Sequence, residues 1–263
     1  MKYFDSHAHY YDGRFSSETE EGADKIIGAL LSSTVSAIVN VGTSPETSRL
    51  AIEQAIRHEN MYTAIGIHPY DANFLLTDMK AAICEIESLI KNPESKCKAL
   101  GEIGLDYHYD GYDPQLQKEY FEAQMSLAER LSVPVVIHDR DAHGDVMEII
   151  RKFPNVKGVM HSYSGSVEMA EELIKLGYMI SFSGTLTFKN ARKTPEVAIR
   201  IPRERVMIET DAPYLAPHPH RGKINHSGYL EYTNCRLAEI WGVTPEECAE
   251  ITDRNARRFF GIK

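Results

Sequence analysis

The sequence contains no apolar run that approaches the ~20 residues needed to cross a bilayer. Its first residues turn polar at once and carry His7, so we expect no signal peptide and a cytoplasmic protein that does not enter membranes. The four cysteines, Cys84, Cys97, Cys235 and Cys248, form no C-x-x-C pair, which removes the usual signature of a zinc finger or a dithiol redox site. We interpret them as reduced thiols without a metal.

Positive charge is also scarce: 29 lysines and arginines stand against 38 acidic residues, and the net charge is −9. Proteins that track nucleic-acid phosphates passively are usually basic, so this balance argues against a broad phosphate-binding surface. It is compatible with an enzyme that meets phosphate locally, through cations and one or two arginines. We see no sign of an obligate protein partner.

Short apolar segments alternate along the chain with longer amphipathic ones. Eight short segments are continuous apolar runs rich in β-branched residues, as is typical of parallel strands buried on both faces. They are Tyr3–Asp5, Ala37–Val41, Thr63–Ile67, Ala99–Leu105, Val133–His138, Gly158–His161, Met179–Phe182 and Val206–Thr210. The predicted helices are Ala23–Ser33, Ser44–Glu59, Asp78–Lys91, Pro114–Leu131, Gly144–Lys152, Val167–Leu176, Pro195–Arg200, Tyr229–Trp241 and Thr244–Phe260.

Eight strands that alternate with helices predict an α/β protein, a (β/α)8 TIM barrel, with two extra helices after the eighth strand. A barrel of this kind needs about 250 residues. The chain has 263 residues, of which 43% are hydrophobic, and it shows no internal linker or low-complexity segment. We therefore expect residues 1–263 to form a single domain.

Ionisable side chains gather at or just after the carboxyl ends of the predicted strands. In a barrel these ends converge on one mouth, where barrel enzymes keep their active sites. The first strand ends in His7-Ala8-His9, and alternation along a strand points both imidazoles to the same side, so one cation can take both rings. Alone, this pair is a modest signal, because a single histidine near a strand is more often structural.

Glu102 lies inside an otherwise apolar strand. An unpaired buried carboxylate costs several kcal/mol, so it needs a partner. The partner is either an arginine or a pair of cations that the carboxylate bridges. We favour the cations, because the flanking Gly101 and Gly104 let neighbouring groups approach closely.

His138 and His161 each end an apolar run on neighbouring strands, and Asp211 follows the eighth strand. A carboxylate such as Asp211 can bind one cation and also take a proton from an attacking water, and we interpret the adjacent Glu209 as the partner of a ligand histidine. The predicted metal ligands are thus His7, His9, Glu102, His138, His161 and Asp211. Four histidines and two carboxylates suit two divalent ions, zinc first and manganese, nickel, cobalt or magnesium as alternatives.

Taken in order, these motifs resemble the TatD family of metal-dependent deoxyribonucleases, within the amidohydrolase-like superfamily. The resemblance runs from Phe4 to about Phe260 and is carried by Phe4–His9, Ala64–Pro69, Gly101–Tyr107, Pro134–Arg140, His161–Gly165, Phe182–Gly184, Glu209–Leu215 and Arg221–Lys223. It implies that Glu102 is shared by both cations. It groups the remaining ligands as His7, His9 and Asp211 on one cation and His138 and His161 on the other.

The resemblance also implies hydrolysis of DNA phosphodiester bonds, with Asp211 and Glu102 as catalytic residues. We interpret His68 and Arg221 as candidate phosphate contacts, and a surface arginine without a role is the alternative for Arg221. An acidic protein should grip only a few nucleotides, so we expect a 3′–5′ exonuclease on single-stranded DNA. Two features depart from the family pattern. Tyr70 stands where the family often has a second histidine, and Ile224–Ser227, expected to shape the substrate pocket, stands where it commonly reads Arg-Asn-Glu-Pro.

Two other functions remain open. The same ligand set resembles sites that hydrolyse another ester or amide, such as a lactone, a phosphotriester or an aminoacyl-tRNA. In the related lactonase and amidase barrels the bridging group is often a carbamylated lysine, so Glu102 favours the nuclease. A non-catalytic metal-binding module is the second alternative, and Asp211 argues against it. Tyr107 and Tyr163 could either stack on a base or pack in the protein, and Arg140 is interpreted as a structural ion partner.

Overall fold

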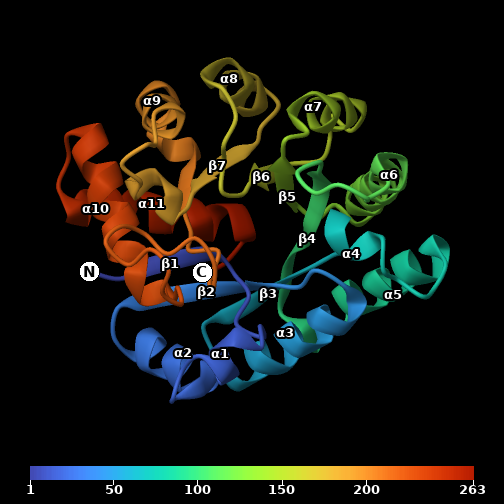
Figure 1. Ribbon diagram of the computed structural model, residues 1–263, viewed down its shortest axis with the longest axis horizontal. Coiled ribbons are helices and arrows are strands. Elements are labelled where there is room, and N and C mark those ends of the chain that lie inside the picture. The colour runs from blue at the N-terminus through green and yellow to red at the C-terminus, as the bar shows by residue number, and fades with distance from the viewer.

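The computed structural model describes all 263 residues and contains one eight-stranded parallel sheet. Its strands pair in chain order: β1 (Tyr3–Ala8), β2 (Val35–Val41), β3 (Met61–Ile65), β4 (Cys97–Asp106), β5 (Val135–Arg140), β6 (Gly158–Met160), β7 (Met179–Phe182) and β8 (Val206–Ile208). The ring closes just beyond β8, where Asp211 N donates to His7 O at 2.9 Å and His9 N donates to Ala212 O at 2.7 Å. The predicted (β/α)8 barrel is therefore confirmed (Figure 1).

Helices surround the barrel and follow the predicted segments closely. They are α1 (Arg14–Ser17), α2 (Gly22–Ser32), α3 (Pro45–Arg57), α4 (Pro69–Ala72), α5 (Met79–Lys91), α6 (Pro114–Leu131), α7 (His143–Lys152), α8 (Val167–Lys175), α9 (Lys193–Arg200), α10 (Leu230–Trp241) and α11 (Pro245–Phe260). Local capping sets several helix starts: the Ser44 side chain accepts from Thr47 N, and the Asp113 side chain accepts from Gln115 N. The four-residue helices α1 and α4 were not predicted, because one turn shows no helical periodicity. No helix combines the length and hydrophobicity of a membrane crossing.

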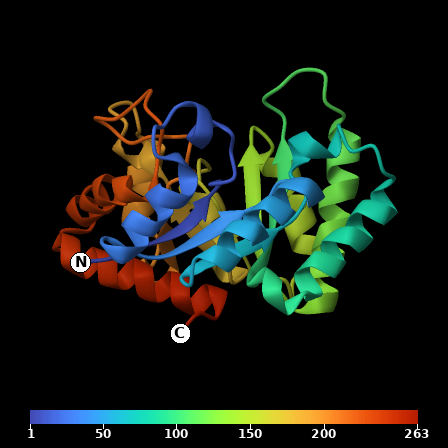
Figure 2. The ribbon, with the colours of Figure 1, turned by 90° about the horizontal axis from the view of Figure 1, so that it is seen from below.

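The barrel interior is filled by side chains that alternate along the strands. Ala37, Val39 and Val41 of β2 belong to this inner cluster, which also contains Phe4 and Phe260. The rings of Phe4 and Phe260 are parallel, with centroids 5.9 Å apart. Helix α11 thus closes the amino end of the barrel, and the loops at the other end stand open around the mouth (Figure 2).

A buried glutamine of α6 positions the segment that follows β3. Gln124 is fully buried; its Oε1 accepts from Ile67 N at 2.8 Å and its Nε2 donates to Ile67 O at 2.9 Å. Both backbone groups of Ile67 depend on this one side chain. The pair of bonds fixes the strand end from which His68 enters the mouth.

We expect Gln124→Ala to lower the free energy of unfolding by about 2–4 kcal/mol, because it leaves a buried N–H and a buried C=O without partners. Urea unfolding of the metal-free protein measures this loss. Gln115→Ala is the matched control, since Gln115 is exposed on the same helix and its side chain bonds only to Glu119. The control should change stability by less than about 0.5 kcal/mol; equal effects of the two substitutions would contradict this role for Gln124.

Candidate metal centre

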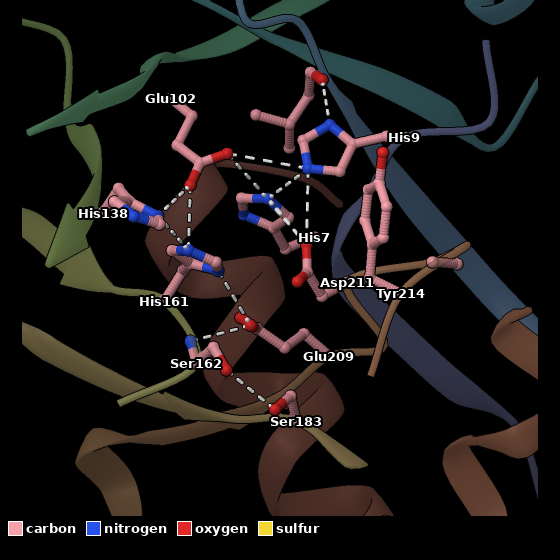
Figure 3. Close-up of polar contacts among 12 residues, drawn as sticks. His7, His9, Glu102, His138, His161, Ser162, Ser183, Glu209, Asp211 and Tyr214 are labelled. Carbon is pink, nitrogen blue, oxygen red and sulfur yellow. Dashed lines mark hydrogen bonds and ion pairs between the residues drawn. The ribbon is translucent and has the colours of Figure 1, made fainter. Parts of the chain in front are cut away.

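The centre of the mouth is the buried carboxylate of Glu102, which is 3% exposed. Its Oε1 lies 2.8 Å from His138 Nδ1 and 2.8 Å from His161 Nε2. Its Oε2 lies 3.3 Å from His7 Nε2 and 3.6 Å from His9 Nε2. One carboxylate oxygen therefore faces one histidine pair and the other oxygen faces the second pair (Figure 3).

Asp211 completes the group around His7 and His9. Its Oδ1 lies 3.3 Å from His9 Nε2 and 3.7 Å from His7 Nε2. Asp211 adopts a left-handed backbone conformation with φ 58°, which is unfavourable for a residue with a side chain. The preceding Thr210 enforces it: its N–H and hydroxyl both donate to Asp5, at 3.0 and 2.6 Å.

For His9 and His161, the hydrogen bond at Nδ1, the ring nitrogen that points away from the centre, determines which nitrogen carries the proton. His9 Nδ1 lies 2.7 Å from the carbonyl oxygen of Val41, and His161 Nδ1 lies 3.1 Å from Glu209 Oε1. A carbonyl or carboxylate can only accept, so each Nδ1 carries the proton. The Nε2 of each neutral ring is therefore bare and faces the centre. Glu209 occupies the place predicted for it, beside a histidine of the centre.

The ring of His138 is turned the other way, so that Nδ1 rather than Nε2 faces the centre, but the nitrogen that faces the centre is again unprotonated. Its Nε2 lies 3.2 Å from Asp106 Oδ2, so the proton sits on Nε2 and the bare Nδ1 faces Glu102. Sequence reasoning assigned no role to Asp106. Its position two residues after Gly104 on the same strand as Glu102 was the available signal.

Within each histidine pair, the ring nitrogens that face the centre lie within hydrogen-bonding distance of each other. His7 Nε2 and His9 Nε2 are 3.0 Å apart, and His138 Nδ1 and His161 Nε2 are 3.2 Å apart. Bare nitrogens at such distances repel each other unless a proton or a cation lies between them. Two histidine pairs joined by a shared carboxylate therefore fit two divalent cations of the kind that accept mixed nitrogen and oxygen ligands.

In the metal-free protein, protons take the place of cations. Burial lowers the pKa of His161, but the charges of Glu102 and Glu209 outweigh it and hold this pKa well above its usual value. Burial raises the pKa of Glu102, yet His161, His7 and His68 hold it well below its usual value. Cations must displace these protons, so metal affinity should weaken as the pH falls.

Comparison with known proteins agrees with this geometry. The sequence matches the TatD-related DNase family over residues 4–261. The chain belongs to this family. It is 40% identical to the uncharacterised metal-dependent hydrolase YabD of Bacillus subtilis over 261 residues, which cover 98% of this chain and 99% of the relative. It is 33% identical to the uncharacterised metal-dependent hydrolase YcfH of Escherichia coli, over 98% of this chain and 95% of the relative.

The fold agrees as well. The crystal structure of YjjV, a TatD homologue from Escherichia coli, superimposes with a TM-score of 0.88 at 27% identity, over 99% of this chain and 98% of that one. A lactonase from Listeria monocytogenes shares only the fold, at 12% identity and a TM-score of 0.68. The protein is thus a TatD-family metal-dependent hydrolase, and the resemblance seen in its sequence is confirmed.

In this TatD-family hydrolase His68 differs from the other histidines of the centre. Its Nδ1 accepts a hydrogen bond from Tyr70 N at 3.0 Å, so the neutral ring carries its proton on Nε2. That Nε2 lies 3.7 Å from Glu102 Oε1. Burial and the neighbouring His138 lower the pKa of His68 to about 3, so the ring stays neutral. His68 presents a proton to the centre, whereas His9, His138 and His161 present lone pairs.

The mouth of the TatD-family hydrolase has two lobes of about 650 Å³ each, which meet at His138, His161 and Asp211. The basic lobe lies beyond the ends of β5 to β7 and contains Arg192 and Lys193. The tyrosine lobe lies beyond the ends of β1 to β4 and contains Tyr11, Tyr70, Tyr109 and Tyr214. Arg140 lines both.

Several sequence interpretations change with the structure. Arg140 forms no ion pair; its guanidinium lies 5.2 Å from the ring centroid of Tyr109, so the structural-partner interpretation is wrong. Tyr107 and Tyr163 pack in the protein, with their hydroxyls donating to Asp145 and to the Ser166 carbonyl, each at 2.7 Å.

The remaining segments lie at the edge of the mouth. Arg221, predicted to contact phosphate, stacks its guanidinium 4.2 Å from the ring centroid of Phe188, which lines the basic lobe. Asn225 lies in the segment expected to shape the pocket, but it is buried and donates to Thr210 O and Tyr214 O at 2.8 and 2.7 Å. This segment supports the Asp211 loop from behind and does not line either lobe.

Asp5 is the buried carboxylate that sequence reasoning missed. It accepts from Thr210 and, at 2.6 Å, from the hydroxyl of Ser227. Burial raises the pKa of Asp5 to about 7, against the opposing effect of these bonds. A carboxylate within an apolar strand, the signal that singled out Glu102, was present here too.

We expect Asp106→Asn to weaken metal binding about 10-fold to 100-fold. Asp106 uses both carboxylate oxygens, Oδ1 to accept from His108 N and Oδ2 to accept from His138 Nε2. Asparagine has only one acceptor oxygen, so its NH₂ group would face either His108 N or His138 Nε2. Competition with a chelating dye for zinc measures this affinity. Asp141→Asn is the matched control, since Asp141 is exposed near the same mouth and bonds only to His108. An unchanged affinity in Asp106→Asn would show that Asp106 does not orient the ligand.

Proposed function

We propose that this hydrolase cleaves the phosphodiester bonds of DNA, acting from the 3′ end of single strands. His7, His9 and Asp211 would hold one divalent cation, His138 and His161 would hold the second, and Glu102 would contribute to both. The whole chain, residues 1–263, serves as one catalytic domain. The observation that carries the proposal is the orientation of His68, whose protonated Nε2 faces a centre suited to two cations and can donate a hydrogen bond there.

Each group then has a definite task. Two divalent cations, when bound, make a water acidic enough to lose a proton near neutral pH and stabilise negative charge on a phosphate. Asp211 would be the residue that accepts a proton from the attacking water. Burial raises its pKa, but its hydrogen bond to His9 and the charges of His161 and His7 lower it below the usual value, so the carboxylate is ionised. His68 donates from Nε2 to a non-bridging phosphate oxygen.

The shape and charge of the mouth support a substrate of few nucleotides. Each lobe holds about 650 Å³, and the net charge of −9 argues against a broad basic surface for a duplex. A chain end can enter the mouth with one lobe on either side of the scissile phosphate. Arg140, Arg192 and Lys193 supply positive charge within reach of the centre.

End-blocked oligonucleotides test this proposal. The metal-free protein is reloaded with zinc, manganese, nickel, cobalt or magnesium and given single strands that are free, blocked at the 3′ end or blocked at the 5′ end. We expect stepwise shortening of free and 5′-blocked strands and little cleavage of 3′-blocked ones. Internal cleavage of blocked strands would make the protein an endonuclease. Hydrolysis of a lactone, a phosphotriester or an aminoacyl-tRNA, with no cleavage of DNA, would refute the proposed substrate.

A further inference from the structure

Four aromatic rings form an exposed cluster beside the mouth, here called the aromatic rim: Tyr70, Phe74, Tyr109 and Tyr112. The side chains of Phe74, Tyr109 and Tyr70 are 59%, 48% and 42% exposed. Ring centroids are 5.1 Å apart for Tyr70 and Phe74, 5.2 Å for Tyr70 and Tyr112, and 6.1 Å for Tyr109 and Tyr112. Large exposed apolar groups that gather in one place mark an interaction site more often than scattered ones.

The aromatic rim is continuous with the candidate metal centre. Tyr70 and Tyr109 line the tyrosine lobe together with Glu102 and His68. Tyr70 donates its backbone N–H to His68. Tyr109 comes from the loop between β4 and α6, which projects beyond the strand ends in Figure 2.

The positively charged side chain of Arg140 lies beside the aromatic rim. The guanidinium of Arg140 lies 5.2 Å from the Tyr109 ring centroid, and its Nη1 donates to the Tyr109 hydroxyl at 3.3 Å. No carboxylate pairs with it, and it is exposed between the two lobes. Its charge is therefore available to an anionic ligand that also contacts the rings.

The charges of the two lobes differ, and this orients such a ligand. Asp12 and Asp71 line the tyrosine lobe and disfavour phosphate there, whereas Arg192 and Lys193 line the basic lobe. A nucleic-acid strand fits this charge distribution if its bases turn toward the tyrosines, away from which its phosphates lie, and its phosphates pass Arg140. Flat bases stack on exposed aromatic side chains with little regard to sequence.

We propose that the aromatic rim stacks unpaired bases of the single-stranded substrate, on the strand that continues past Arg140 from the scissile phosphate. This inference rests on the proposed nuclease function and adds the subsite that selects single strands. A paired base cannot present its face to the rim without leaving the duplex. The rim thus makes unpaired nucleotides the preferred substrate.

The double variant Phe74→Ala/Tyr109→Ala tests the subsite with two matched strands. One strand carries natural bases, and the other carries tetrahydrofuran residues, which keep the phosphates and lack the bases. We expect the variant to raise KM for the natural strand about 5-fold to 150-fold, the range for the loss of one stacked base, with kcat little changed. On the base-free strand the variant and the wild type should have the same KM.

Leu76→Ala is the matched control, because Leu76 is fully exposed close to Phe74 in sequence and carries no ring. It should leave both KM values unchanged. An unchanged KM for the natural strand in the double variant, or an equal rise for both strands, would overturn the rim as a base-stacking subsite.

The two proposals can fail separately. If the wild type cleaves DNA and the double variant behaves like it, the nuclease stands and the rim proposal falls. If the wild type cleaves no strand, the proposed function fails, and a binding experiment then tests whether the aromatic rim stacks bases. A strand with 2-aminopurine should then lose fluorescence on binding to the wild type and not to the double variant; no quenching by the wild type overturns the rim proposal too.

Discussion

Replacing Glu102 with glutamine should abolish hydrolysis, with a loss in kcat/KM larger than the ~10²–10³-fold typical of one electrostatic contact in an active site. Glu102 is the one side chain that lies within 3.6 Å of His7, His9, His138 and His161. Glutamine keeps the shape of the side chain but removes its negative charge and one of its two acceptor oxygens. Both histidine pairs then lose the carboxylate that balances a cation.

Metal content and activity should fall together in this variant. Mass spectrometry under native conditions counts the bound ions, and far-ultraviolet circular dichroism shows whether the barrel is intact. Glu87→Gln is the control: Glu87 pairs with Arg130 and Lys91 on the surface, far from the mouth in the fold. A folded Glu102→Gln protein that kept two ions and full activity would disprove the assignment of the centre.

Asp211→Asn should lower kcat about 10²-fold to 10⁴-fold, the usual contribution of a positioned general base. Asp211 belongs to one histidine pair only and reaches it at 3.3 and 3.7 Å, so its loss should affect one ion and spare the other. Asparagine can still accept a hydrogen bond, and it adopts the left-handed backbone more readily than most residues. The fold should therefore survive.

Measuring both metal content and rate distinguishes the role of Asp211 from that of Glu102. Asp211→Asn should retain at least the ion at His138 and His161 while the rate collapses, whereas Glu102→Gln should lose both. Rates are compared at saturating zinc or manganese, so that weaker binding does not mimic a slower reaction. If Asp211→Asn turns over substrate at the wild-type rate, another group takes the proton.

The sequence predicted the barrel because its signals are local. Continuous apolar runs rich in β-branched residues mark strands buried on both faces, and capping residues such as Asp113 mark helix starts. Predicted strand bounds differ from the observed ones at both ends of the barrel. At the amino end, β2, β3 and β4 each begin two residues earlier than predicted. Bounds at the mouth differ by similar amounts. β1 extends to Ala8, whereas β8 already ends at Ile208. There the backbone leaves the ladder to present side chains, and tertiary contacts decide where it does so.

The sequence alone led us to expect that the six residues predicted as ligands meet at one mouth, because parallel strands bring their carboxyl ends together whatever lies between them. The structure brings these six side chains together. What only the tertiary structure decided is which nitrogen carries the proton in His9, His138 and His161. Asp106 and His138 are 32 positions apart in the sequence, and Asp5 and Thr210 are 205 apart, so no local sequence pattern predicts their hydrogen bonds. The same holds for the aromatic rim, whose rings come from the segment around α4 and from the loop between β4 and α6. Strand ends converge by the geometry of the fold, whereas hydrogen-bond partners and stacked rings depend on side-chain packing between distant segments.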